Sequence, residues 1–193
     1  MRRMCQHASR MLVAVACVAM ISQSAAAQAR GGMGSFHPGY TDIGPVIGLG
    51  GIGGANLAIG GRFEHGIQTL PSMANGTLGF QVGLDYWSWS RVFEGPPGVF
   101  YTRRISYLPI GATFNYHFKL DEPKFDPFVG LGLGYDIVSC SGGPFPDGCG
   151  YDSGLYLIAR AGVRYFMSPG LALYGDVGAG AAALNIGLMF KMQ

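Results

Sequence analysis

The sequence predicts an all-β protein, a membrane-spanning eight-stranded antiparallel up-and-down β-barrel. Apolar and polar residues alternate in eight segments, and alternation of period two is typical of strands with two different faces. The chain also begins like a secreted protein. It is 49% hydrophobic and only 12% charged, yet beyond this leader it has no apolar run near the roughly 20 residues that a membrane helix needs. We therefore expect the apolar face of the strands to be turned toward lipid.

Residues 1–29 are predicted to be a cleaved signal peptide. Three arginines give this segment a basic start, residues 11–21 are apolar, and Ala27 or Ala29 precedes the cut. The apolar run is too short for a retained membrane anchor, and the part before Cys17 is too short for a lipoprotein signal. Cleavage leaves ten basic groups against eleven acidic ones. This balance excludes the basic surface that nucleic acid requires.

Cleavage also leaves only two cysteines, Cys140 and Cys149. Two cysteines this close together in an exported chain are most simply explained by a disulfide that closes one loop.

The remaining elements follow in chain order. Residues 30–42 are rich in glycine and aperiodic, which predicts a flexible periplasmic lead-in, and residues 43–193 are expected to form the barrel. Its alternating segments are Ile43–Ile52, Leu57–Ile67, Thr77–Val92, Arg103–Phe118, Pro127–Val138, Gly154–Phe166, Leu171–Gly180 and Leu184–Met192. Each is near or above the roughly ten residues of a tilted membrane strand.

The even-numbered and odd-numbered links between these segments differ in composition and length. The second, fourth and sixth links (68–76, 119–126 and 167–170) are polar or turn-like. The odd links (53–56, 93–102, 139–153 and 181–183) include the two longest loops. Both termini of such a barrel are periplasmic, so the odd links are expected outside the cell.

The two faces of the strands carry different chemistry. In the sixth segment, leucine, alanine and valine occupy one face, whereas Arg160 and Arg164 share the other. The predicted inward charges are Arg62, Glu64, Asp85, Asp136, Arg160, Arg164, Asp176 and Lys191. Because an isolated buried ion costs several kcal/mol, we expect Arg160 and Arg164 to pair across the bore with Asp85, Asp136, Asp176 or Glu64.

Aromatic residues gather near the predicted strand ends and suggest two girdles at the lipid headgroups. One rim would hold Tyr86, Trp89, Phe93, Phe100 and Tyr101, and the other Tyr116, Phe118, Phe125, Phe128, Tyr165 and Phe166.

The chain resembles the small outer-membrane β-barrel proteins of Gram-negative bacteria, the eight-stranded group with OmpA-like and OmpX-like domains. The similar parts are residues 105–118, 128–135, 161–165, 171–177 and 184–187. The C-terminal assembly signal of that group is matched by Asn185, Gly187, Phe190 and Met192, although the chain ends in Met-Gln rather than in an aromatic residue. The resemblance implies an outer-membrane location, lipid as surroundings, and the barrel assembly machinery and periplasmic chaperones as partners during biogenesis. It implies little about activity, because this fold serves adhesins, anchors and lipid enzymes alike.

No motif predicts catalysis, a cofactor or a metal. Gly48, Gly50 and Gly53 match a dinucleotide fingerprint, but no helix is predicted behind them to hold a pyrophosphate. Of the histidines His37, His65 and His117, none has the neighbouring serine of a lipid hydrolase, and they do not form a zinc set. In the cysteine loop, Asp147, Tyr151 and Asp152 are expected to be a solvated surface, with contact to a partner or divalent ion as the alternative.

These observations favour a structural or surface-interaction role with a bore filled by side chains. The alternatives are a narrow pore for small solutes, a lipid-modifying enzyme, and a secreted soluble barrel that holds a ligand inside.

Overall fold

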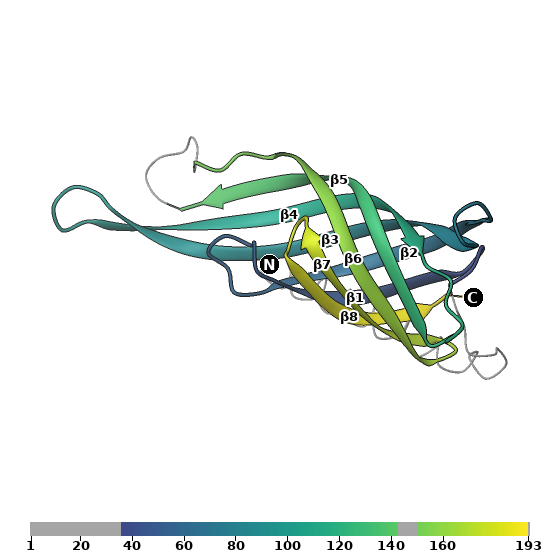
Figure 1. Cartoon of the computed structure of the whole chain (residues 1–193). Helices are drawn as coiled ribbons and strands as arrows, with labels where there is room; N and C mark the ends of the chain where they lie inside the picture. The colour runs from purple at the N-terminus through teal and green to yellow at the C-terminus, as the bar shows by residue number, and fades with distance from the viewer. Residues whose placement is uncertain (1–35, 143–149, 193) are drawn as a thin grey trace, which may run out of the picture.

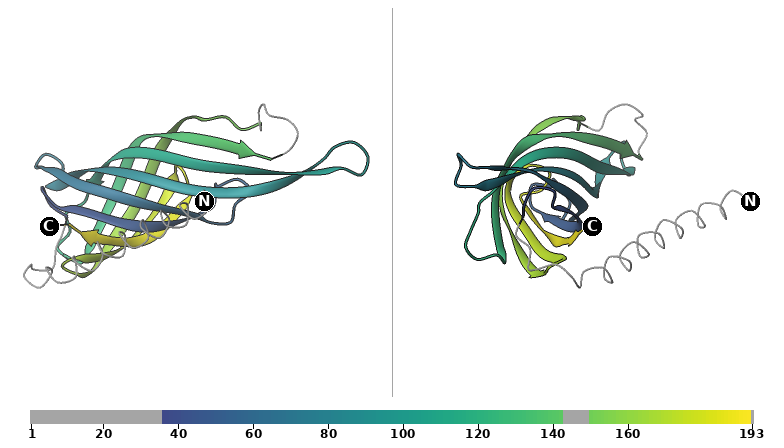
Figure 2. Two further views of the ribbon diagram at one scale, coloured as in Figure 1. Left: turned by 180° about the vertical axis from the view of Figure 1, so that it is seen from behind. Right: turned by 90° about the vertical axis from the view of Figure 1, so that its right-hand side faces the viewer.

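The computed structural model describes residues 36–142 and 150–192, which form one closed antiparallel barrel. Each strand pairs with its neighbours in the chain, and β1 closes the ring on β8. The end-on view in Figure 2 shows this ring. The strands are β1 (Thr41–Leu49), β2 (Ala58–Leu70), β3 (Gly76–Glu94), β4 (Phe100–His117), β5 (Phe125–Ser141), β6 (Gly154–Ser168), β7 (Leu171–Ala179) and β8 (Leu184–Lys191). The predicted fold class and all eight predicted strands are confirmed, with shifted ends.

No helix in the described ranges is long and apolar enough to cross a membrane.

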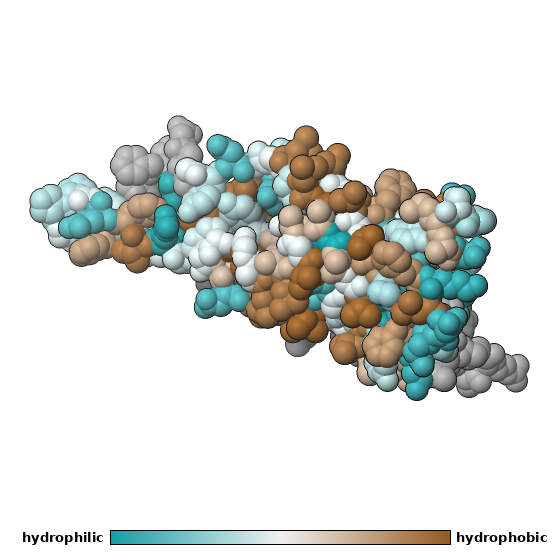
Figure 3. All heavy atoms as spheres, viewed as in Figure 1, coloured by the Kyte–Doolittle hydropathy of each residue, from teal (hydrophilic) through white to brown (hydrophobic). Residues whose placement is uncertain are grey.

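The outer surface of the barrel is apolar. Along β5 and β6 every second side chain points outward, and the outward leucines Leu131, Leu155 and Leu157 are 71%, 78% and 74% exposed. On the face shown in Figure 3, hydrophobic residues gather over the middle of the barrel and hydrophilic ones toward its ends. Exposure of so much aliphatic surface is unfavourable in water. The barrel is therefore built to lie in hydrocarbon, with its polar residues inside.

The two ends of the barrel differ in shape. We call the end that holds the start of β1 and the end of β8 the terminal end, and the opposite one the far end. At the far end β3 and β4 continue beyond the other strands as a long hairpin (Figure 1). Residues 93–102, which the sequence predicted to be a loop, are mostly paired strand, with Phe93 opposite Tyr101. The turn itself is confined to residues 95–99, where Gly-Pro-Pro-Gly stops both strands.

The lead-in also differs from the flexible segment predicted for residues 30–42. In its described part, Phe36 and Tyr40 are buried in the terminal end of the barrel, and β1 already starts at Thr41. The backbone of this part is fixed on β2, since the Gly39 amide donates to the Gly66 carbonyl and the Gly66 amide donates to the Tyr40 carbonyl, both at 2.8 Å. Burial of two aromatic rings supplies the driving force.

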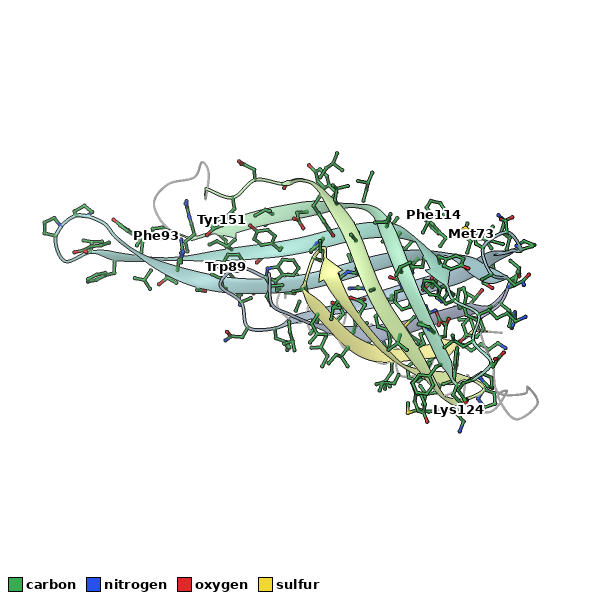
Figure 4. All side chains as sticks on the ribbon, in the orientation of Figure 1. Met73, Trp89, Phe93, Phe114, Lys124 and Tyr151 are labelled. Atoms are coloured by element: carbon green, nitrogen blue, oxygen red, sulfur yellow. The ribbon has the colours of Figure 1, made fainter. Side chains whose placement is uncertain are left out.

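The aromatic girdles are only partly as predicted. Phe118, Phe125 and Tyr165 lie on the outer surface of the terminal end. Phe128 and Phe166, however, point into the core. At the far end Trp89 faces inward, and Phe93, Phe100 and Tyr101 lie on the protruding hairpin, with Phe93 labelled in Figure 4.

Candidate functional site in the barrel interior

The terminal half of the bore is filled by polar side chains around Arg164. This arginine comes from β6 and crosses the bore to form an ion pair with Glu64 of β2, the strand on the opposite side of the ring. Its guanidinium also lies 3.3 Å from a carboxylate oxygen of Asp126 and 3.3 Å from one of Asp42. The side chains of Arg164, Glu64 and Asp42 are 0% exposed. A charge this deeply buried is tolerated because it is paired.

Neutral polar groups complete the network around Glu64. Gln81 and Asn115 donate side-chain amide hydrogen bonds of 2.9 and 2.8 Å to its carboxylate. The two ring nitrogens of His117 each lie 2.9 Å from a carboxylate oxygen, one of Glu64 and the other of Asp126. The network thus joins side chains from β2, β3, β4, β5 and β6, and β1 adds Asp42. We call these seven residues the Arg164 network.

Aromatic rings close this half of the bore. Phe36 stacks on His117 with ring centroids 3.7 Å apart and lies 4.9 Å from the Arg164 guanidinium carbon. Phe128 and Tyr174 flank the same guanidinium at 5.6 and 5.9 Å. Gly79 leaves room for this arrangement, because a Cβ there would lie 3.0 Å from the Phe36 ring and 2.5 Å from Glu64. The Phe36 ring therefore closes the bore at the terminal end.

Two further ion pairs fill the middle of the bore, each between neighbouring strands. Arg62 of β2 lies 3.0 Å from Asp85 of β3. Arg160 of β6 pairs with Asp176 of β7, and its second terminal nitrogen donates to the Ala182 carbonyl. A space of only about 30 Å³ remains between these pairs.

The structure places the predicted inward charges as follows. Arg62, Glu64, Asp85, Arg164 and Asp176 are buried in the bore. Arg160 and Asp136 are partly buried on inward positions, and Lys191, at the end of β8, has its ammonium group 5.4 Å from the Tyr40 ring. Of the two expected arginine pairs, Arg164 crosses the bore to reach Glu64, whereas Arg160 pairs with its neighbouring strand.

The far half of the bore has an aromatic wall instead of an ion network. The Tyr107 ring is stacked between Trp87 and Trp89, with centroid distances of 5.3 Å on each side and interplanar angles of 5° and 14°. Tyr151 stands edgewise to Trp89 and Tyr107 at 5.7 and 6.3 Å. Figure 4 shows Trp89 and Tyr151 near each other, where the long hairpin leaves the barrel. A cavity of about 270 Å³ opens beside these rings.

Several interior residues were not recognised as a site from the sequence. The sequence places Asp42 in the lead-in, Asp126 in a turn, and His117 on the inward face near the rim as a residue with satisfied hydrogen bonds. Trp89 could have been found, because it shares strand parity with the inward residues Asp85 and Trp87. Nothing in the sequence around Phe36 indicates that its ring closes the bore.

Other predicted features have these positions. Asn185 is buried and donates to Asp176 at 2.9 Å, Gly187 is also inward, and Phe190 lies on the outer face of β8. Residues 48–53 form the end of β1 and the turn toward β2.

The described residues contain no group of three or more His, Cys, Asp or Glu side chains able to hold a metal ion. The signal peptide, Asp147 and Cys149 lie outside the described residues, so the Cys140–Cys149 bond stays a prediction.

The overall architecture matches solved transmembrane barrels. A de novo designed transmembrane β-barrel is 19% identical, with a TM-score of 0.51 over 82% of this chain and 99% of the designed one. The outer membrane protein OprG from Pseudomonas aeruginosa is 13% identical, with a TM-score of 0.53 over 83% of this chain and 99% of OprG. No family model matches the sequence, and no curated protein is significantly similar to it. The fold is thus that of the eight-stranded transmembrane β-barrels, as the sequence resemblance implied.

Proposed function

We propose that this protein is a plugged outer-membrane barrel that anchors its far-end loops and long hairpin as a surface for interaction. The observation that carries the proposal is the filled bore: Arg164 is fully buried, ion-paired from one wall to the other, and covered by Phe36. Side chains that are held by ion pairs and hydrogen bonds on several strands do not move aside at low cost. The barrel then serves as a rigid support, and the parts outside the membrane meet the environment.

The location and orientation belong to the same proposal. A cleaved signal peptide over residues 1–29 and the C-terminal signal at Asn185, Gly187, Phe190 and Met192 would take the chain to the outer membrane through periplasmic chaperones and the barrel assembly machinery. Short turns at the terminal end and the long hairpin at the far end fit a periplasmic terminal end and an external far end. A Cys140–Cys149 disulfide would then close an external loop.

Planar-bilayer recording tests the plug. Full-length mature protein is reconstituted with a general porin as the positive control, and folding is verified by the difference in gel migration between the unboiled and the boiled protein. We expect no conductance steps above the bare membrane at any protein density that gives steps with the porin. Reproducible single-channel steps from the inserted wild type would contradict the plug and favour the alternative of a narrow pore.

The geometry gives less support to an enzyme. His117 and Asp126 are in contact, but both are enclosed in the Arg164 network, and no serine, threonine or cysteine hydrogen-bonds to this histidine among the described residues. A hydrolase needs a nucleophile at that position. Mass spectrometry of lipid A and phospholipids with and without expression would show a mass change if the protein modified lipid.

A further inference from the structure

The cavity at the far end of the bore is lined by aromatic rings and by small residues. Its volume is about 270 Å³, below the usual range of about 300–1,000 Å³ for drug-sized ligands. A ligand that fits it must therefore be small. The lining residues are Gly51, Gly53, Trp87, Trp89, Tyr107, Asp136, Tyr151, Tyr156, Gly180 and Ala181.

The aromatic side of the cavity is held in place by packing. Tyr107 is clamped between the two tryptophans. The turn between β1 and β2 packs closely on Trp89, because a Cβ added to Gly54 would lie 2.7 Å from the indole ring. Trp87 is 5% exposed and packs in a cluster with Ile52 and Ala182. These rings form a preorganised surface for an apolar group.

Asp136 gives the cavity its charge. Among the residues that the structure describes, it is the one charged residue of the lining, and its buried Oδ1 has no hydrogen-bond partner. The three carboxylates of the Arg164 network and those of Asp85 and Asp176 all have a cationic partner. An unpaired buried acceptor is costly, and a ligand that donates to it recovers that cost.

We propose that this cavity binds a small organic ammonium ion, an amine with a compact apolar body. The ammonium group would donate to Asp136, and the apolar body would lie against Trp89 and Tyr107. Ca²⁺ takes about six to eight oxygen ligands, far more than one carboxylate supplies, and an anion would meet the Asp136 charge without a basic residue in the described lining. The aromatic surroundings favour a cation further.

Tyr156 and Ala181 line both this cavity and the space of about 30 Å³ at mid-bore, where the Arg62 and Arg160 ion pairs lie. A space of that size is too small to pass an organic amine. The amine therefore binds and leaves through the far end. In the proposed function the far end faces the cell exterior. Only this orientation of the entry rests on that proposal.

Intrinsic fluorescence offers a specific readout, because the chain has two tryptophans and both line this cavity. Mature protein in dodecyl maltoside micelles, an uncharged detergent without amines, is titrated with 2-phenylethylamine. The neutral 2-phenylethanol and the anionic phenylacetate serve as matched probes of similar shape. The same titrations are repeated on Asp136→Asn and on Asp152→Asn, which removes an equal charge from an exposed position nearby.

We expect a saturable fluorescence change with the amine and weaker binding of the alcohol and the acid. Loss of the charged hydrogen bond should weaken amine binding to Asp136→Asn by about tenfold or more, whereas Asp152→Asn should bind like the wild type. Equal affinities for the three probes, an unchanged affinity in folded Asp136→Asn, or no saturation would each overturn the proposal. Folding of both variants is checked by gel migration, and the comparison of probes on the wild type does not depend on any variant. Because this readout does not involve conductance, failure of the plug and failure of this site are distinguishable.

Discussion

The terminal and far halves of the bore are filled in different ways, although the same strands build both. In the terminal half, Arg164 pairs with the carboxylates of Glu64, Asp126 and Asp42, and two amides and a histidine hydrogen-bond to Glu64. In the far half, aromatic rings stack on one wall, and the buried carboxylate oxygen of Asp136 has no partner.

This difference separates two tasks that a small barrel must perform. A network in which Arg164 pairs with three carboxylates holds the strands together and blocks the bore, and Asp42, whose oxygens make no hydrogen bond within the described part of the chain, is fully buried beside that arginine. A cavity with an unpaired carboxylate costs stability and gains the ability to recognise a cation. This division of tasks predicts that substitutions in the terminal half mainly affect stability and that those in the far half mainly affect binding.

The largest effect is expected for Arg164→Ala. The change leaves three buried carboxylates around the vacated position, and removal of one partner from a buried ion pair costs about 3–5 kcal/mol. The free energy of unfolding is measured by urea titration in lipid vesicles. Arg91→Ala, which removes an exposed arginine from the long hairpin, is the control and should change it by less than about 0.5 kcal/mol. Equal stability of the two variants would show that the network does not hold the barrel together.

A smaller loss is expected for Phe36→Ala. The ring is 6% exposed and covers His117 and Arg164, and truncation of a buried phenylalanine costs about 3 kcal/mol. The low end of the usual range applies because the site is at the open terminal end, where water can enter the space. His37→Ala alters the exposed neighbour and should be nearly neutral. If Phe36→Ala and His37→Ala both unfold at the same urea concentration as the wild type, the Phe36 ring does not stabilise the terminal end of the barrel.

The strands and their two faces were predictable from the sequence, because hydrocarbon outside and polar groups inside impose alternation on every strand. Leu155 and Leu157 on one face and Arg160 and Arg164 on the other show how clear that signal is. Alternation ends where the membrane ends. Beyond that point both faces of a strand are wet, so the paired hairpin around Phe93 and Tyr101 carried no periodic signal and was predicted to be a loop.

The partners within the bore could not be predicted in the same way. Alternation gives the face of a residue but not its height in the barrel, which depends on strand register and tilt. Asp126 is placed beside Arg164 by the pairing of β5 with β6, and Glu64 reaches Arg164 only because the ring closes. Phe36 belongs to no strand at all. Its burial is decided by the shape of the end that it fills.

The smallest effect on stability should come from the far half. Trp89→Leu removes one stack with Tyr107 and one edgewise contact with Tyr151, and such aromatic pairs are each worth about 0.5–1.5 kcal/mol. Trp89 is only partly buried, so we expect the free energy of unfolding to fall by about 1 kcal/mol in the same urea titration. This loss is well below that of Arg164→Ala. Trp89→Phe keeps a ring against Tyr107 and should recover part of the loss.

Binding of 2-phenylethylamine, followed through the remaining Trp87, should weaken more in the leucine variant than in the phenylalanine variant. A stability loss as large as that of Arg164→Ala, with amine binding unchanged, would mean that the aromatic wall is a second structural core, and the division of tasks between the two halves of the bore would be wrong.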